Sequence, residues 1–171
     1  MKARSISGWL VLLALPLLVS VLLLAAGREE KAQTSGASQA MSVGLEDVKW
    51  EVMLPELGKD SPQITILRVD PHTQATQLMI RAPRAIHVPF HWHSANETHT
   101  MIRGVAVFEH AGKREKLGPG GFNYIPARMQ HQAWLSDNAL TFITVDSAWD
   151  ITWVSGPPQK SDVGKAPPAN K

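Results

Sequence analysis

Two histidines and an acid lie close together near the middle of the 171-residue chain. His91 and His93 are two residues apart, so on a β-strand both imidazoles leave the same face. Glu97 follows after a segment short enough to be a tight turn. Two imidazoles and a carboxylate that converge offer nitrogen and oxygen donors to a divalent Zn, Fe, Mn, Ni, Co or Cu ion. A His-x-His pair alone is equally typical of two surface histidines on an edge strand.

The chain has further histidines outside this group. His99 lies two residues beyond Glu97 and therefore on the same strand face. It is a candidate for a residue that bonds to a metal ligand or relays a proton, and equally for a partly exposed residue near the mouth of the fold. Glu97 is the only acid in the string, which makes it both a candidate ligand and a candidate general base. His72 and His110 lie in turn contexts, where we expect solvated side chains.

The elements that must position these residues are short strands. Prolines and glycines separate segments that are rich in β-branched residues or alternate polar with apolar ones. Ala111-Gly112 is a two-residue hairpin turn before a further strand at 113–117. No window has a sustained helical period with caps, so we predict an all-β chain folded as an antiparallel sandwich or barrel. The predicted strands are 48–54, 63–69, 76–82, 98–102, 105–109, 122–125, 131–135, 140–145 and 150–154.

The composition along the chain predicts one folded domain between two irregular segments. A chain of this length suits one domain, and its 44% apolar content is that of a globular protein. Residues 28–44 are rich in Ala, Ser, Gln and Gly, which is typical of a flexible linker. Residues 156–171 hold four prolines among polar residues and are predicted to form a disordered tail. The domain is expected over residues 45–155.

Residues 1–27 are predicted to carry the protein out of the cytoplasm. Lys2 and Arg4 precede an uncharged run of eighteen residues, Trp9 to Ala26. That length is near the minimum for a membrane anchor, whereas Pro16 and the small residues that end the run favour a cleaved signal peptide. Whether the segment is an anchor or a signal peptide, its basic end stays on the cytoplasmic side of the membrane. The rest of the chain is therefore expected to be periplasmic or secreted, with membrane contact only through this segment.

Charge and cysteine content exclude several classes of protein. The net charge of +2 rests on Lys2 and Arg4, because 15 basic and 15 acidic residues cancel from Arg28 onward. Nothing here indicates the clustered basic face of a nucleic-acid-binding protein. The chain has no cysteine, which excludes disulfides, thiolate metal sites and cysteine nucleophiles.

The spacing of the metal-type residues is similar to a known family. The first motif of the cupin superfamily resembles the string His91-x-His93-x3-Glu97-x6-Gly104. After fifteen intervening residues, Gly120-x5-Pro126-x4-His131 resembles the second cupin motif, at the distance typical of small single-domain bacterial cupins. The closing strand looks like that of small exported cupins. Three positions depart from the motifs: Ala85 and Arg128 stand where glycines are usual, and Leu135 stands where the second motif closes with Asn. A positive φ at Arg128 would carry strain.

The resemblance implies a fold and a metal. The fold is a double-stranded β-helix, the jelly-roll barrel, and the cofactor is one divalent transition metal. Carried over residue by residue, the metal ligands would be His91, His93, Glu97 and His131. Trp134, three residues beyond His131, would face away from the metal cavity.

The resemblance leaves two classes of function open. The first is an exported metal-dependent dioxygenase or isomerase, because four protein ligands on an octahedral metal leave two positions for a small-molecule substrate and O₂ or water. The second is a non-catalytic cupin that binds or senses a metal or small ligand. No further carboxylate stands beside the ligands in the sequence, which favours this second class. Cupins frequently dimerise, so a homodimer is a further implication.

Overall fold

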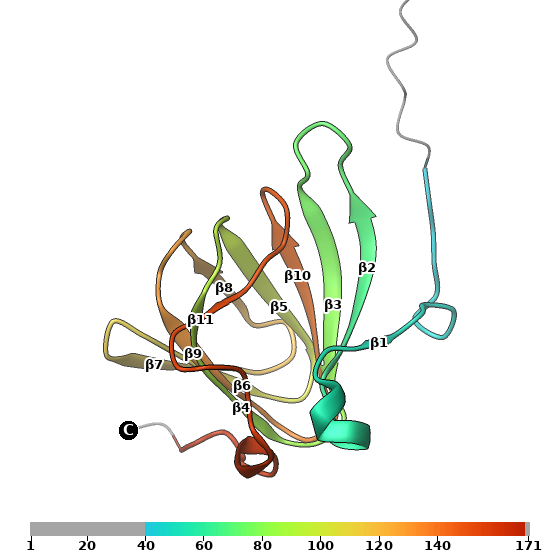
Figure 1. Ribbon diagram of the computed structural model, residues 1–171. Coiled ribbons are helices and arrows are strands. Elements are labelled where there is room, and N and C mark those ends of the chain that lie inside the picture. Colours follow the sequence, from blue (N-terminus) through green and yellow to red (C-terminus); the bar gives the residue numbers. More distant parts are fainter. Residues whose placement is uncertain (1–39, 170–171) are drawn as a thin grey trace, which may run out of the picture. The chain divides into compact units, whose positions relative to one another are not determined.

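The computed structural model describes residues 40–169, and these form two antiparallel sheets that face each other (Figure 1). The proposed export segment and most of the linker lie outside the described residues. None of the helices within 40–169 has the length and apolar character needed to cross a membrane. In chain order the strands are β1 (Glu51–Val52), β2 (Gln63–Val69), β3 (Thr76–Ala82), β4 (Ile86–Trp92), β5 (Glu97–Arg103), β6 (Ala106–His110), β7 (Lys113–Leu117), β8 (Phe122–Ile125), β9 (His131–Leu135), β10 (Ala139–Val145) and β11 (Thr152–Trp153).

The sheets interleave along the chain as in a jelly roll. One sheet has the order β1-β2-β3-β10-β5-β8, and the other has the order β11-β4-β9-β6-β7. Apolar side chains from both sheets form the core between them, including Met101 and Ile125 from the first sheet and Ile86, Phe108 and Leu135 from the second. The prediction of an all-β jelly-roll barrel is confirmed.

Most of the strands expected from the sequence pattern are present. Residues 63–69, 76–82, 122–125 and 131–135 are strands with the predicted bounds. The expected strand at 48–54 is shorter, because only Glu51 and Val52 pair with β2. After it, Pro55–Asp60 forms a 3-10 helix, η1, with proline at its first turn, where the missing N–H costs nothing.

Two turns with positive φ fix the ends of strands near the site. Ala111 and Gly112 both have positive φ, 48° and 73°, as a tight two-residue hairpin turn requires. Arg128 has φ 63°, so the strained conformation anticipated for this motif position is present. Its backbone N–H donates to the carbonyl oxygen of His93 over 2.8 Å. This bond ties the loop before β9 to the end of β4.

The predicted disordered tail over 156–171 is wrong for the described part, because residues 156–165 pack against the barrel. A short 3-10 helix, η2 (Lys160–Asp162), places the Asp162 carboxylate in a buried position, 3.1 Å from Nδ1 of His87. The backbone N–H of Gly164 donates to the carbonyl oxygen of Ala85 over 2.7 Å. Pro158 is fully buried and Val163 packs against the core, and polar bonds to β4 and the residue before it also hold the segment in place.

Candidate metal centre

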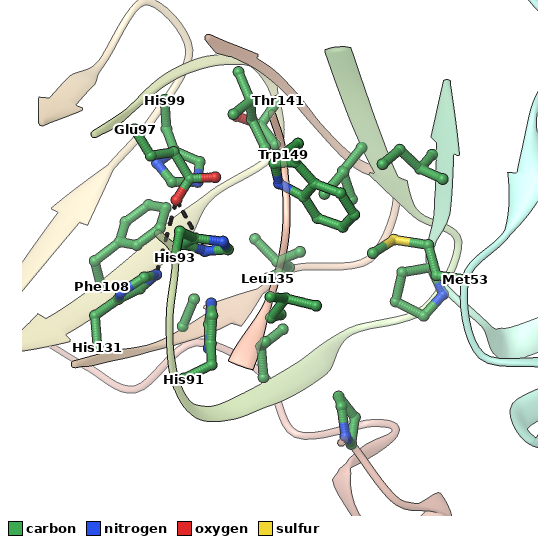
Figure 2. A pocket seen from close by; sticks show the side chains of 18 of the residues that line it. Met53, His91, His93, Glu97, His99, Phe108, His131, Leu135, Thr141 and Trp149 are labelled. Atoms are coloured by element: carbon green, nitrogen blue, oxygen red, sulfur yellow. Dashed lines mark ion pairs between the residues drawn. The ribbon is translucent and has the colours of Figure 1, made fainter. Parts of the chain in front are cut away.

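Three histidines converge inside the barrel. His91 lies on β4, His93 follows directly after β4, and His131 begins β9, which pairs with β4 so that His91 and His131 are direct partners. All three side chains are buried, and one ring nitrogen of each lies within 4.8 Å of the others. Figure 2 shows the three rings gathered at one end of a cavity. The period-two prediction for His91 and His93 therefore holds, and the barrel adds His131.

Backbone carbonyls fix which ring nitrogen faces the cavity. Nδ1 of His91 lies 2.7 Å from the carbonyl oxygen of Pro89, and Nδ1 of His93 bonds to that of Asp150. Nδ1 of His131 lies 3.1 Å from the carbonyl oxygen of Met129. Because a carbonyl oxygen only accepts, each Nδ1 must carry the proton. Each Nε2 is then left with a free lone pair, the tautomer that a metal-binding histidine needs.

Glu97 reaches the histidines from the opposite sheet. It begins β5, and the turn before it is held by Asn96, whose N–H donates to the Asp146 carboxylate over 3.0 Å. Its Oε2 lies 3.1 Å from Nε2 of His93 and 4.0 Å from Nε2 of His131. This oxygen is fully buried and has no hydrogen-bond partner. An unpaired buried oxygen that faces imidazole lone pairs is an arrangement that a cation between them would satisfy.

Burial favours the uncharged form of each of these side chains. Desolvation, and then repulsion from His131, lowers the pKa of His91 to about 2. Desolvation also lowers the pKa of His131 to about 4 and that of His93 in the same direction. It raises the pKa of Glu97 to about 8, against the opposing effect of the Trp149 indole. The imidazoles are thus neutral at pH 7, as ligation requires, while the carboxylic acid must lose its proton.

Comparison with known proteins agrees with this geometry. Residues 77–146, which carry the first motif and the second, match the sequence profile of the cupin domain family. The chain belongs to the cupin superfamily. Its motifs therefore describe a cupin site, in which His91, His93 and His131 are the three buried histidines positioned for a metal.

Solved structures with the same fold are distant in sequence. An RmlC-like cupin from Shewanella frigidimarina is 16% identical, covers 65% of this chain and 93% of its own, and has a TM-score of 0.54. The polyketide cyclase RemF from Streptomyces resistomycificus is 18% identical over 68% and 86% of the two chains, with a TM-score of 0.54. A proposed acetylacetone dioxygenase from Methylibium petroleiphilum is 13% identical over 71% and 86%, also with a TM-score of 0.54. No curated protein gives a significant match.

His99 also lies inside this cupin, so the alternative of an exposed residue at the mouth is wrong. Its Nδ1 lies 2.9 Å from the Oδ1 atom of Asn123 on β8, and its Nε2 lies 3.6 Å from Oε1 of Glu97. Its ring packs on Phe108 at 4.7 Å between centroids. Asn123 was not foreseen, although alternation along residues 122–125 places it on the inner face. His99 thus contacts the acid rather than joining the three histidines.

The remaining histidines lie elsewhere. His72 is exposed in a turn, and His110 lies 3.8 Å from the Glu115 carboxylate at the end of β6. His87 points out of the cavity, where it bonds to Asp162 and stacks on Trp134 at 4.7 Å. Trp134 accordingly faces away from the metal-type group, as its spacing from His131 predicts.

The group forms one end of a cavity of about 290 Å³. Sequence reasoning did not foresee the two tryptophans in its wall, Trp149 and Trp153, because the segment that carries them has little regular structure. Rings of His93 and Trp149 lie 6.3 Å apart, and those of His91 and Trp153 lie 5.2 Å apart. The site therefore has histidines and an acid at one end and apolar walls beyond it (Figure 2).

Proposed function

We propose that this cupin binds one divalent transition metal through His91, His93, His131 and Glu97 and uses it to transform a small molecule. The observation that carries the proposal is the convergence of one ring nitrogen from each of the three buried histidines, with the unpartnered Oε2 of Glu97 3.1 Å from His93 and 4.0 Å from His131. Imidazole nitrogens with one carboxylate suit Fe, Mn, Ni, Co, Cu or Zn. When bound, such a metal would supply a Lewis acid with open positions for substrate and for O₂ or water.

The chain's own residues suit a dioxygenase or an isomerase. Glu97 is both a proposed ligand and the candidate base: burial raises its pKa to about 8 in the absence of a cation, so it can take up a proton whenever it is not coordinating the metal. His99 lies next to Oε1 of Glu97 and is neutral, because burial lowers its pKa to about 3. His99 can therefore orient Glu97 without adding charge. The structural neighbours include a cyclase and a proposed dioxygenase, which supports chemistry on small molecules.

A binding module is the second candidate, and one observation favours it. Glu97 is the only carboxylate that lines the cavity among residues 40–169. If Glu97 ligates the metal throughout, no other side-chain acid is left in the cavity for proton transfer. The protein would then hold or sense its ligand without turnover.

Oxygen uptake separates the two candidates. The metal-loaded protein is incubated with phenolics, diketones and thiols, and O₂ consumption is recorded together with deuterium incorporation from D₂O into the recovered compounds. Uptake supports a dioxygenase, and deuterium exchange or rearrangement without uptake supports an isomerase. Stoichiometric binding with neither signal would assign the protein to the binding module. The Glu97→Gln variant is the matched control for proton transfer.

We further propose that the barrel works outside the cytoplasm. The basis is the sequence of residues 1–27, with Lys2 and Arg4 ahead of an uncharged run. A reporter that is active only after export, fused after Lys171, tests this. Activity of the fusion is the expected result, and activity only of a reporter that works in the cytoplasm would contradict export.

A further inference from the structure

The polar groups of the cavity lie on one side. Five side chains, His91, His93, Glu97, His99 and His131, form the polar end, while the hydroxyl of Thr141, which also lines the cavity, donates to the backbone carbonyl oxygen of Thr100. Met53 lies across the cavity from them in Figure 2. Apolar side chains that include Leu54, Ile64 and Ile80 also line the cavity. No lysine, arginine or aspartate of the described residues lines the cavity. A bound molecule would therefore find partners for polar atoms at one end only.

We infer that the cognate ligand of this cupin is a small molecule with a single oxygen-bearing polar end and an uncharged, apolar body. The inference rests on the proposed function, because the polar end of the ligand would lie where the proposed metal binds. It goes further by assigning the class of molecule, and it excludes sugars, polyols, phosphates and dicarboxylates. Each of those would place a hydroxyl or charged group against the apolar side of the cavity, without a partner.

A second observation comes from Trp149, whose indole Nε1 is buried at the polar end without a hydrogen-bond partner. The indole stands near enough to Glu97 to lower the pKa of that carboxyl, but makes no full hydrogen bond with it. A buried N–H donor left unpaired costs free energy that an acceptor on a ligand would recover. A carbonyl or hydroxyl oxygen at the polar end of the ligand is such an acceptor.

The walls set the size and shape of the apolar body. The cavity volume of about 290 Å³ lies at the lower limit of sites that take drug-sized molecules, so the ligand is smaller than these. Phe108, Trp149 and Trp153 line the cavity, and aromatic walls pack well against a planar ring. A molecule with one aromatic ring and a short substituent fits both the small volume and the aromatic walls.

A matched pair of ketones tests the charge of the far end. The probes are 4-methylacetophenone and 4-acetylbenzoate, which share the acetyl group and differ by a methyl group against a carboxylate. Binding to the metal-loaded protein is measured by isothermal titration calorimetry. We expect 4-acetylbenzoate to bind at least ~100-fold more weakly, because its carboxylate would be buried without a cation. Equal affinities, or no binding of either ketone up to its solubility limit, would overturn the inference.

Two variants test the two ends separately. Met53→Lys puts a flexible cation at the apolar end, and we expect ~10-fold tighter binding of 4-acetylbenzoate. The matched control is Val52→Lys, because Val52 is exposed and does not line the cavity. Trp149→Phe removes the N–H and keeps a ring, so 4-methylacetophenone should lose ~3–10-fold in affinity. Binding of 4-ethyltoluene, which has no acceptor, should stay unchanged in that variant. No change with either variant would refute the proposed orientation.

The metal content of each sample keeps this test separate from that of the proposed function. If the protein holds no metal and still discriminates between the ketones, the ligand class stands and the metal proposal fails. If the metal is bound and both ketones bind equally, the metal proposal stands and the ligand class is wrong.

Discussion

Oε2 of Glu97 lies 3.1 Å from Nε2 of His93, although His93 follows a strand of one sheet and Glu97 begins a strand of the other. The chain crosses between the sheets in three residues, and Asn96 holds that crossing through Asp146. Both side chains are almost fully buried. The jelly-roll crossing is therefore what brings a buried acid to face buried imidazoles.

Substitution of one histidine should abolish metal binding. His91→Ala removes one of the three converging Nε2 atoms, and we expect loss of stoichiometric metal with the barrel still folded, because most of the core is apolar. The control is His72→Ala, since His72 is exposed in a turn. Metal content of the purified variants, with circular dichroism for folding, checks this. Full metal content in His91→Ala would contradict the ligand assignment.

Metal binding should release a proton from Glu97. Without metal, burial raises the pKa of Glu97 to about 8, so at pH 6–7 the acid holds a proton that a metal must displace. The pKa values of the imidazoles are lowered, so His91 and His131 hold no proton in this range. Affinity should therefore fall about tenfold for each pH unit below ~8.

Calorimetric titrations of metal in buffers of different ionisation enthalpy measure that proton. We expect one proton released for each metal at pH 6.5 in the wild type and none in Glu97→Gln. Release of no proton by the wild type would show that Glu97 is not a ligand or is already ionised.

His99 should affect the metal through Glu97 rather than by ligation. Its Nε2 lies 3.6 Å from Oε1 of Glu97, and Asn123 holds its other nitrogen. We expect His99→Ala to weaken metal binding by at most ~10–100-fold and to keep one metal per chain at saturation. Thr100→Ala, the next residue on the same strand, should leave affinity unchanged. Complete loss of metal in His99→Ala would instead make His99 a ligand.

Deletion of residues 156–171 should destabilise the barrel. The carboxylate of Asp162 accepts from Gln159, bonds to His87 and pairs with Lys165, and all of these bonds are lost with the segment. We expect the Tm to fall by more than ~4 °C, which corresponds to ~1 kcal/mol in a domain of this size. An unchanged Tm would show that the segment adds no stability.

A point variant isolates the buried carboxylate. Asp162→Ala leaves His87 and two donors without their acceptor, and such losses cost about 1–3 kcal/mol. Asp60→Ala is the matched control, because Asp60 makes only a surface ion pair with Lys59. Equal thermal stability of the two variants would contradict the role assigned to Asp162.

Local pattern predicts much of this fold and site. Alternation with period two gives the strand faces, so His91 and His93 are correctly placed side by side, and Trp134 is correctly placed outside the cavity. The meeting of these histidines with His131 depends on the pairing of β4 with β9, and their meeting with Glu97 depends on the crossing to the other sheet. Only the resemblance in motif spacing pointed to it, since periodicity carries no information on distant partners.

The parts that the sequence pattern misses are held by distant polar contacts. Residues 156–165 look disordered by composition, yet His87 and Ala85, far away in the chain, supply the bonds that order them. Asn123 bonds to His99, and Trp149 lowers the pKa of Glu97, each from another segment of the chain. No local rule connects these residues before the barrel has closed.

Metal analysis of the purified full-length protein tests the central claim most directly. The protein is isolated without added metal or chelator, and its metal content is measured by inductively coupled plasma mass spectrometry before and after titration with Mn, Fe, Co, Ni, Cu and Zn. We predict one divalent metal per chain at saturation in the wild type and no stoichiometric metal in His91→Ala. A protein that carries no metal as isolated and binds none of the six would contradict it.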